Sequence, residues 1–81
     1  MTEQQLITLG FTKEQEMMSE EGAYYYYTLD IVPHFSLITD ASDTIKDGKW
    51  SVTLFEVPEL LFNDYERLVE FIAVVRKNMQ I

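Results

Sequence analysis

The chain has 81 residues, no cysteine and a hydrophobic fraction of 47%. This length suits one domain with one core, and we expect residues 1–81 to form a single domain. The missing thiols exclude a disulfide framework and a thiolate metal site, which favours a reducing, cytoplasmic setting. No apolar run approaches the length of a membrane span, and the polar residues after Met1 do not resemble a signal peptide.

Acidic side chains outnumber basic ones, with 14 Asp and Glu against 6 Lys and Arg and a formal net charge of −8. A field of this sign repels phosphate backbones and anionic membranes, so we expect no direct nucleic-acid binding and no membrane binding. It would attract a basic surface on a partner protein and speed the encounter. The simpler interpretation is that the acidic surface keeps a small protein in solution.

The first ten residues predict a short helix. Thr2 can cap its start, Gln5 stands where it completes a capping box, and Gly10 suits the position after the helix end. A helix this short is not stable alone. It must lean on a sheet through its apolar side chains, Leu6, Ile7 and Leu9.

Residues 11–18 and 24–32 predict the two strands of a hairpin, joined by a turn at residues 19–22. The second strand is the clearest in the chain, because it is rich in aromatic and β-branched residues. Successive side chains of a strand point to opposite faces. One face is apolar and should enter the core: Tyr25, Tyr27, Leu29 and Ile31. The other face grades from aromatic to polar: Tyr24, Tyr26, Thr28 and Asp30.

Turn signals divide the middle of the chain. Pro33 cannot donate to a sheet ladder, so Pro33-His34 predicts a turn into a strand at Phe35–Thr39. The polar segment 40–44 indicates a loop. Asp47-Gly48 predicts a tight turn, because both central residues of such a turn need positive φ. Whether the residues on either side of this turn pair, or the whole segment is a loop, stays open.

Residues 50–57 predict the next strand, which Pro58 should end. Residues 60–62 could then add a short edge strand. Alternation places Trp50, Val52 and Leu54 on one face of this strand and Ser51, Thr53, Phe55 and Val57 on the other.

The last element is a predicted helix, which Asn63 should cap with Glu66 completing the capping box. Its apolar stripe has helical spacing: Tyr65, Leu68, Ile72, Val75 and Met79. The whole pattern predicts an α+β fold with a short N-terminal helix, an antiparallel four- to five-stranded meander sheet and a C-terminal helix packed on one face.

A catalytic site has little support in the sequence. Ser36, His34 and Asp30 could be forced into a nucleophile–base–acid set, but no spacing makes them converge. The better interpretation of His34 is an exposed turn residue. The glycines are isolated, so no phosphate-binding loop exists. We therefore predict no catalytic residue and no enzyme activity.

A metal site is also disfavoured. Asp40, Asp43 and Asp47 could gather around a hard cation, but their spacing does not match a calcium-binding loop. Carboxylates between strands are usually solvated turn formers. We predict no metal and no cofactor, and a small metal-binding or enzymatic domain is the least favoured alternative.

The functional prediction depends on aromatic side chains on one face of the sheet. Tyr24, Tyr26 and Phe55 are predicted to share the sheet face opposite the C-terminal helix. Exposed aromatic clusters rimmed by polar groups mark interfaces, because large rigid rings give contact area at low entropic cost. This face is a candidate interaction surface for another protein or a second copy. The alternative is that the N-terminal helix covers it.

The motifs also suggest a relationship. They run in the order Leu9-Gly10-Phe11, the tyrosine strand, residues 35–42, residues 50–55 and a leucine-rich C-terminal helix. This outline resembles small uncharacterised proteins encoded by bacteriophages and other bacterial mobile elements. The resemblance transfers no functional residue but implies a compact accessory protein that binds other proteins. Some acidic proteins of this kind inhibit host nucleases by imitating DNA.

Two functional expectations follow from the sequence. The first is a non-catalytic protein-interaction or self-associating module. The second is an acidic nucleic-acid mimic that inhibits a host nucleic-acid-binding protein.

Overall fold

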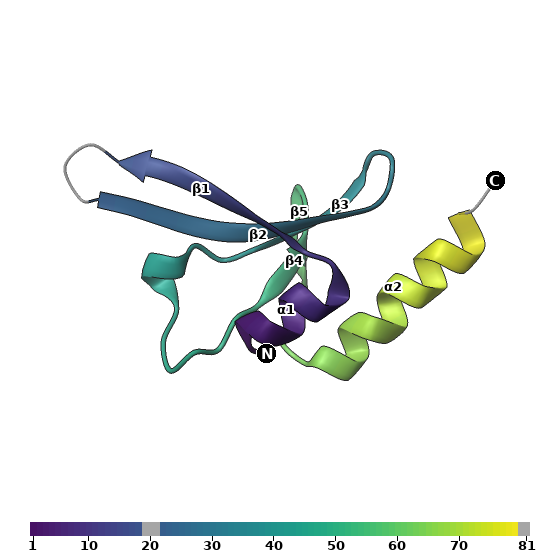
Figure 1. The fold of residues 1–81 in the computed structure, drawn as a ribbon. Helices are drawn as coiled ribbons and strands as arrows, with labels where there is room; N and C mark the ends of the chain where they lie inside the picture. The colour runs from purple at the N-terminus through teal and green to yellow at the C-terminus, as the bar shows by residue number, and fades with distance from the viewer. Residues whose placement is uncertain (19–21, 80–81) are drawn as a thin grey trace.

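The computed structural model describes residues 1–18 and 22–79. In chain order its elements are α1 (Glu3–Leu9), β1 (Thr12–Met18), β2 (Gly22–Val32), β3 (Phe35–Thr39), the 3₁₀ turn η1 (Ser42–Thr44), β4 (Val52–Leu54), β5 (Val57–Phe62) and α2 (Tyr65–Met79) (Figure 1). The strands form one antiparallel sheet in the order β1-β2-β3-β4-β5. The predicted α+β meander with a helix at each end is confirmed.

The N-terminal helix has the predicted ends. The Gln5 amide donates to the Thr2 hydroxyl and the Thr2 amide donates to the Gln5 side chain, which forms the capping box. Gly10 has φ 100°, and its amide donates to the Ile7 carbonyl at 3.0 Å. The next amide, of Phe11, donates to Leu6, so the helix ends in a Schellman motif that turns the chain directly into β1.

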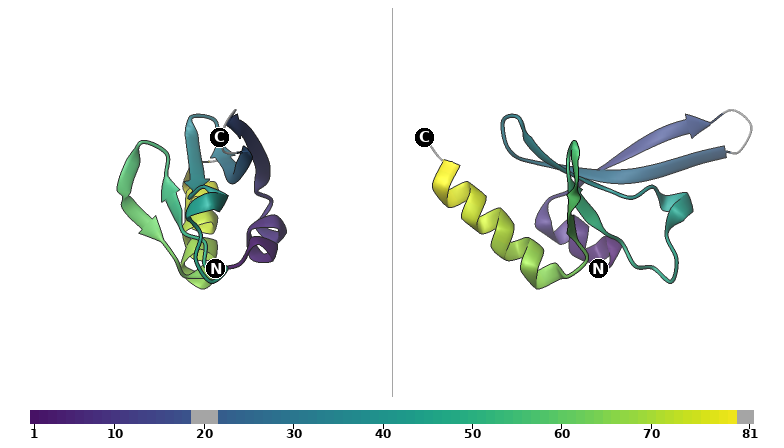
Figure 2. Two further views of the ribbon diagram at one scale, coloured as in Figure 1. Left: turned by 90° about the vertical axis from the view of Figure 1, so that its left-hand side faces the viewer. Right: turned by 180° about the vertical axis from the view of Figure 1, so that it is seen from behind.

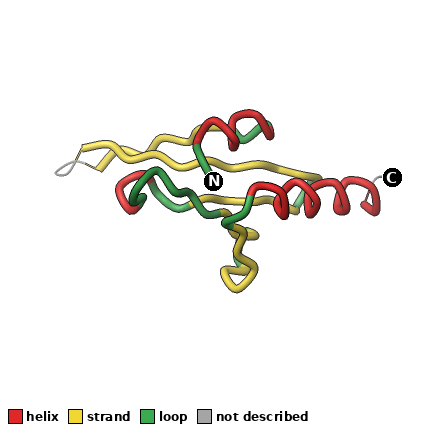
Figure 3. The backbone as a smooth tube through the Cα atoms, turned by 90° about the horizontal axis from the view of Figure 1, so that it is seen from below, coloured by secondary structure: helices red, strands yellow, loops and turns green. Residues whose placement is uncertain are grey.

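Both helices pack on the same face of the sheet. Figure 1 shows α1 and α2 below the β1–β2 strands, and Figure 3, seen from below, shows both on that side. Leu6 of α1 and Leu68 of α2 are fully buried in one hydrophobic core. The other buried apolar members of this core are Phe11, Tyr27, Leu29, Ile31, Leu37, Trp50, Val52, Ile72 and Val75. The core phase predicted for the tyrosine strand is therefore right, with Tyr25 half-buried at its margin.

Aromatic contacts join α2 to the sheet and Trp50 to β2. The Phe71 ring of α2 lies 4.9 Å from the Phe62 ring and 6.1 Å from the Phe35 ring, between ring centroids. Trp50 lies 5.4 Å from Tyr27 in an edge-to-face arrangement. These contacts hold α2 along β3 and β5, and they fix the start of the β4 segment beneath β2.

The strand predicted at residues 50–57 is wrong at both ends, because β4 begins only at Val52 and does not reach Val57. β4 ends at Leu54, a turn follows at Phe55-Glu56, and Val57 already belongs to β5. Glu56 has φ 69°, a left-handed conformation that is uncommon outside glycine and asparagine. Pro58 does not end a strand but lies inside β5, which tolerates proline because it is at the sheet edge. Figure 2 shows the β4–β5 hairpin standing apart from the β1–β2 pair.

Three smaller differences concern turns and caps. α2 begins at Tyr65, and the Asp64 carbonyl accepts from the Leu68 amide, so Asp64 rather than Asn63 precedes the helix. Asp47 and Gly48 both have positive φ, and one bridge, Lys46 with Lys49, closes this turn. The predicted turn at 19–22 falls on residues 19–21, which lie outside the described residues, while Gly22 begins β2 and pairs with Met18.

Within residues 1–18 and 22–79, no helix is both long and apolar enough to cross a membrane.

Candidate interaction surface

The sheet face opposite the helices, here called the open face, carries the alternate residues of every strand. Strand register places five of them in one row across the sheet: Thr12, Thr28, Ile38, Thr53 and Leu61. Leu61 and Phe55 are exposed apolar side chains on this face, at 54% and 55% of their possible area. Neither helix of the described chain packs on this face. The sheet therefore presents apolar side chains to solvent on this side.

The alternative in which α1 covers the open face is wrong. The Tyr27 hydroxyl donates to the Glu3 carboxylate of α1 at 3.1 Å, and Tyr27 belongs to the opposite phase of β2 from Tyr26. Phe11 directs this choice, because it is buried on the Tyr27 side and directly follows the Gly10 turn. Ile7, predicted to lean on the sheet, is instead 51% exposed.

The three residues predicted to form the interaction surface do not all meet. Tyr26 and Phe55 line one shallow hollow of about 230 Å³ on the open face. Tyr24 is in the same phase of β2 but does not line this hollow. Tyr24 and Tyr26 are half-buried, so Phe55 is the most accessible ring of the three. The other lining residues are Thr28, Asp30, Ser36, Leu37 and Ile38.

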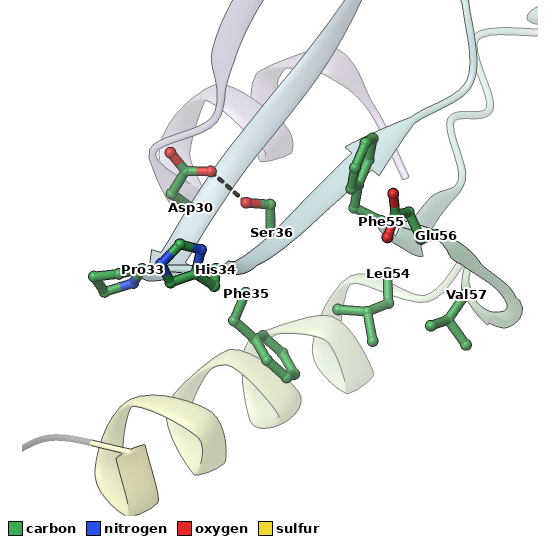
Figure 4. Close-up of a pocket in the computed structure, with 9 residues that line it drawn as sticks. All are labelled: Asp30, Pro33, His34, Phe35, Ser36, Leu54, Phe55, Glu56 and Val57. Carbon is green, nitrogen blue, oxygen red and sulfur yellow. Dashed lines mark hydrogen bonds between the residues drawn. The ribbon is translucent and has the colours of Figure 1, made fainter.

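A larger pocket of about 680 Å³ adjoins this hollow at the end of the sheet. It lies between the β2–β3 turn at Pro33-His34 and the β4–β5 turn at Phe55-Glu56 (Figure 4). The two depressions share Asp30, Ser36 and Phe55. Figure 4 shows Phe55 pointing away from α2, whereas Phe35 and Leu54 point toward it.

Polar contacts order the open face. The Ser36 hydroxyl donates to the Asp30 carboxylate, its cross-strand partner. The Thr28 hydroxyl donates to Glu14 at 3.4 Å, and the Phe55 amide donates to the Ser36 carbonyl at 2.9 Å. The residues that line the pocket, all within the described chain, include two carboxylates, Asp30 and Glu56, and no lysine or arginine. At this end of the sheet, the exposed Phe55 ring therefore has carboxylates beside it.

The sequence did not anticipate that Asp30, His34 and Ser36 would line one pocket. Asp30 and Ser36 pair across β2 and β3, and the Ser36 hydroxyl is bonded directly to the carboxylate. A nucleophile–base–acid set needs the imidazole between these two groups. Cross-strand register was the signal that could have found the Asp30–Ser36 pair.

The predicted absence of a metal site stays a prediction. Among the described residues, no three His, Asp or Glu side chains are grouped so that they could hold a metal ion. Asp40, Asp43 and Asp47 are all described and do not form such a group.

The perturbed tyrosines lie on the helix face. Burial raises the pKa of Tyr27 to about 12, and the hydrogen bond to Glu3 adds to the effect. Glu3 also raises the pKa of Tyr25, through hydrogen bonding first and then, after the effect of burial, through its negative charge. The Tyr25 ring stacks on Trp50 at 5.8 Å and has the Lys13 ammonium 4.0 Å from its centroid. These groups form a structural cluster between β2 and α1, separate from the open face.

No protein-family model, curated protein or solved structure matches the chain. The resemblance to bacteriophage proteins therefore stays an expectation.

Proposed function

We propose that this chain is a non-catalytic protein-binding module whose open face docks on a basic partner protein. One observation carries the proposal: both helices pack on one side of the sheet, while Phe55, Leu61 and Ile38 remain on the other. Exposed apolar groups surrounded by polar ones are typical of docking surfaces. Rings near the centre of such a patch supply most of the binding energy.

The charges on the open face favour a basic partner over a second copy. Docking two copies through this face would bring Glu14, Asp30 and Glu56 of one chain close to the same carboxylates of the other. Like charges brought together at an interface oppose association. The net charge of −8 adds a long-range repulsion between copies and an attraction toward a basic surface.

The test is a comparison of two exposed side chains on opposite sides of the molecule. Phe55 on the open face and Val74 on α2 are exposed to 55% and 57%. Immobilised protein is incubated with a cell lysate as the wild type, as Phe55→Ser and as Val74→Ser. We expect basic proteins that the wild type and Val74→Ser retain and that Phe55→Ser loses.

Salt and size measurements separate the competing interpretations. A nucleic-acid mimic would bind through charge alone, so capture would survive Phe55→Ser and disappear at high salt. A self-associating module would elute as a dimer in light-scattering chromatography, and Phe55→Ser would convert it to a monomer. Either result overturns the proposal, as does a wild type that captures nothing.

A further inference from the structure

We propose that the pocket between the β2–β3 and β4–β5 turns is an arginine-binding site that receives an arginine side chain of the partner. The proposal rests on the proposed function and names the contact that would give it specificity. It is carried by the pocket itself, which combines a cavity, two carboxylates and the exposed Phe55 ring at the end of the open face.

The shape of the pocket comes from two hairpins that diverge. β3 and β4 stay paired up to Leu37 and Leu54, and the Phe55 amide still bonds to the Ser36 carbonyl. Beyond this point the chain turns at His34 in the β2–β3 turn and at Glu56 in the β4–β5 turn, which both have left-handed backbone conformations with φ 68° and 69°. A space of about 680 Å³ remains between the two turns, which is enough for a long side chain and part of its peptide.

The walls suit a flat cation. Figure 4 shows Asp30 and Ser36 on one side of the pocket and Phe55 with Glu56 on the other, so a group entering between them meets a carboxylate from each hairpin. A guanidinium is planar, presents five N–H donors in a rigid fork and stacks on aromatic faces. It can donate to carboxylates on both sides and lie against the exposed Phe55 ring. An ammonium group lacks the stacking surface.

The pocket also lies where a partner would arrive. It shares Asp30, Ser36 and Phe55 with the hollow that Tyr26 lines, so one peptide segment can span both. An apolar side chain would fill the hollow, and an arginine a few residues away would enter the pocket. The partner is thus expected to present an arginine beside an apolar residue.

The experiment titrates ¹⁵N-labelled protein with N-acetyl-arginine amide and follows backbone amide shifts. We expect saturable shifts at Ser36, Phe55 and Glu56 with a dissociation constant on the order of millimolar, since two solvent-exposed ion pairs and one stacking contact form in an open pocket. N-acetyl-citrulline amide has the same shape without the charge and should bind at least about tenfold more weakly, a difference of roughly 1.4 kcal/mol. N-acetyl-lysine amide should also bind more weakly.

Three charge-removing variants provide the matched comparison. Asp30→Asn and Glu56→Gln should each weaken arginine-amide binding by about two- to fivefold, as expected for an exposed ion pair. Glu59→Gln removes the same charge from an exposed residue of β5 that does not line the pocket, and it should leave binding unchanged. Shifts scattered over the surface, equal binding of the citrulline compound, or an equal effect of Glu59→Gln would overturn the proposal.

The two proposals fail in different ways. If arginine amide does not bind but Phe55→Ser still abolishes capture, the docking face stands and the arginine site is wrong. If arginine amide binds in the pocket but Phe55→Ser captures the same proteins as the wild type, the docking face is wrong.

Discussion

α1 packs on the sheet through Leu6, and truncating this side chain tests that packing. Leu6 is fully buried in the core, while its neighbour Ile7 is 51% exposed. Truncating a buried leucine to alanine costs about 2–5 kcal/mol, because transfer energy is lost and a cavity remains. Alanine is the better helix former, so the loss cannot come from helix propensity. A domain of this size is expected to have a total free energy of unfolding of roughly 4–12 kcal/mol.

We therefore expect Leu6→Ala to lower the free energy of unfolding by about 3 kcal/mol and Ile7→Ala to change it by less than about 1 kcal/mol. Urea unfolding followed by fluorescence of Trp50, the one tryptophan in the sequence, measures both. Trp50 is 4% exposed, so its environment changes on unfolding. Equal costs for the two variants, or a cost below about 1 kcal/mol for Leu6→Ala, would refute the packing of α1 through Leu6.

Three further predictions concern single residues. The raised pKa of Tyr27 means that its stabilising effect is complete below pH 10 and is lost as the pH rises through about 12, so the urea midpoint should fall across that window. Glu3→Gln should lower the Tyr27 pKa in an ultraviolet titration, and an unchanged pKa would contradict the Glu3 contact. Glu56→Gly should leave the thermal midpoint unchanged or raise it. Glu56→Val should lower the free energy of unfolding by about 1 kcal/mol, because φ 69° strains a β-branched residue. The reverse order of the two variants would mean that the turn has a different backbone conformation. Gly10→Ala should lower the free energy of unfolding by about 1 kcal/mol, because Gly10 has φ 100° and alanine is strained there. The added Cβ itself has room, since the nearest atom, Leu29 Cδ1, is 3.9 Å away. An unchanged urea midpoint would argue against the Schellman motif at the end of α1.

Local signals in the sequence were sufficient where one residue type has one physical use. Gly10 and the Asp47-Gly48 turn were predictable because positive φ favours those residues. The buried phase of β2 followed from alternation alone, since only one face of that strand is apolar throughout.

The Phe55-Glu56 turn could not be predicted, because neither residue type favours positive φ. Phenylalanine and glutamate carry no turn signal, and residues 50–57 alternate like a continuous strand. Glu56 adopts φ 69° because pairing of Leu54 with Val57 closes the hairpin around it. The pocket beside this turn could not be predicted either, because the turn forms one of its sides.

The sequence also did not predict which face of the sheet α1 covers. A seven-residue helix with Leu6, Ile7 and Leu9 could lean on either face. The choice depends on Phe11, whose burial and short link to Gly10 bring the helix under Tyr27. Likewise, Asp30 and Ser36 converge only through the register of β2 with β3.

The two outer strands of the meander have a consequence for how copies of this chain behave in a crowded solution. A meander sheet leaves β1 and β5 unpaired on one side, and such edges can recruit further strands and start aggregation. β1 carries Lys13 and Glu14, and β5 carries Pro58, which has no amide hydrogen to offer a neighbour. The edges therefore resist strand addition, so contacts with other proteins should form through side chains on the sheet face and not through backbone pairing.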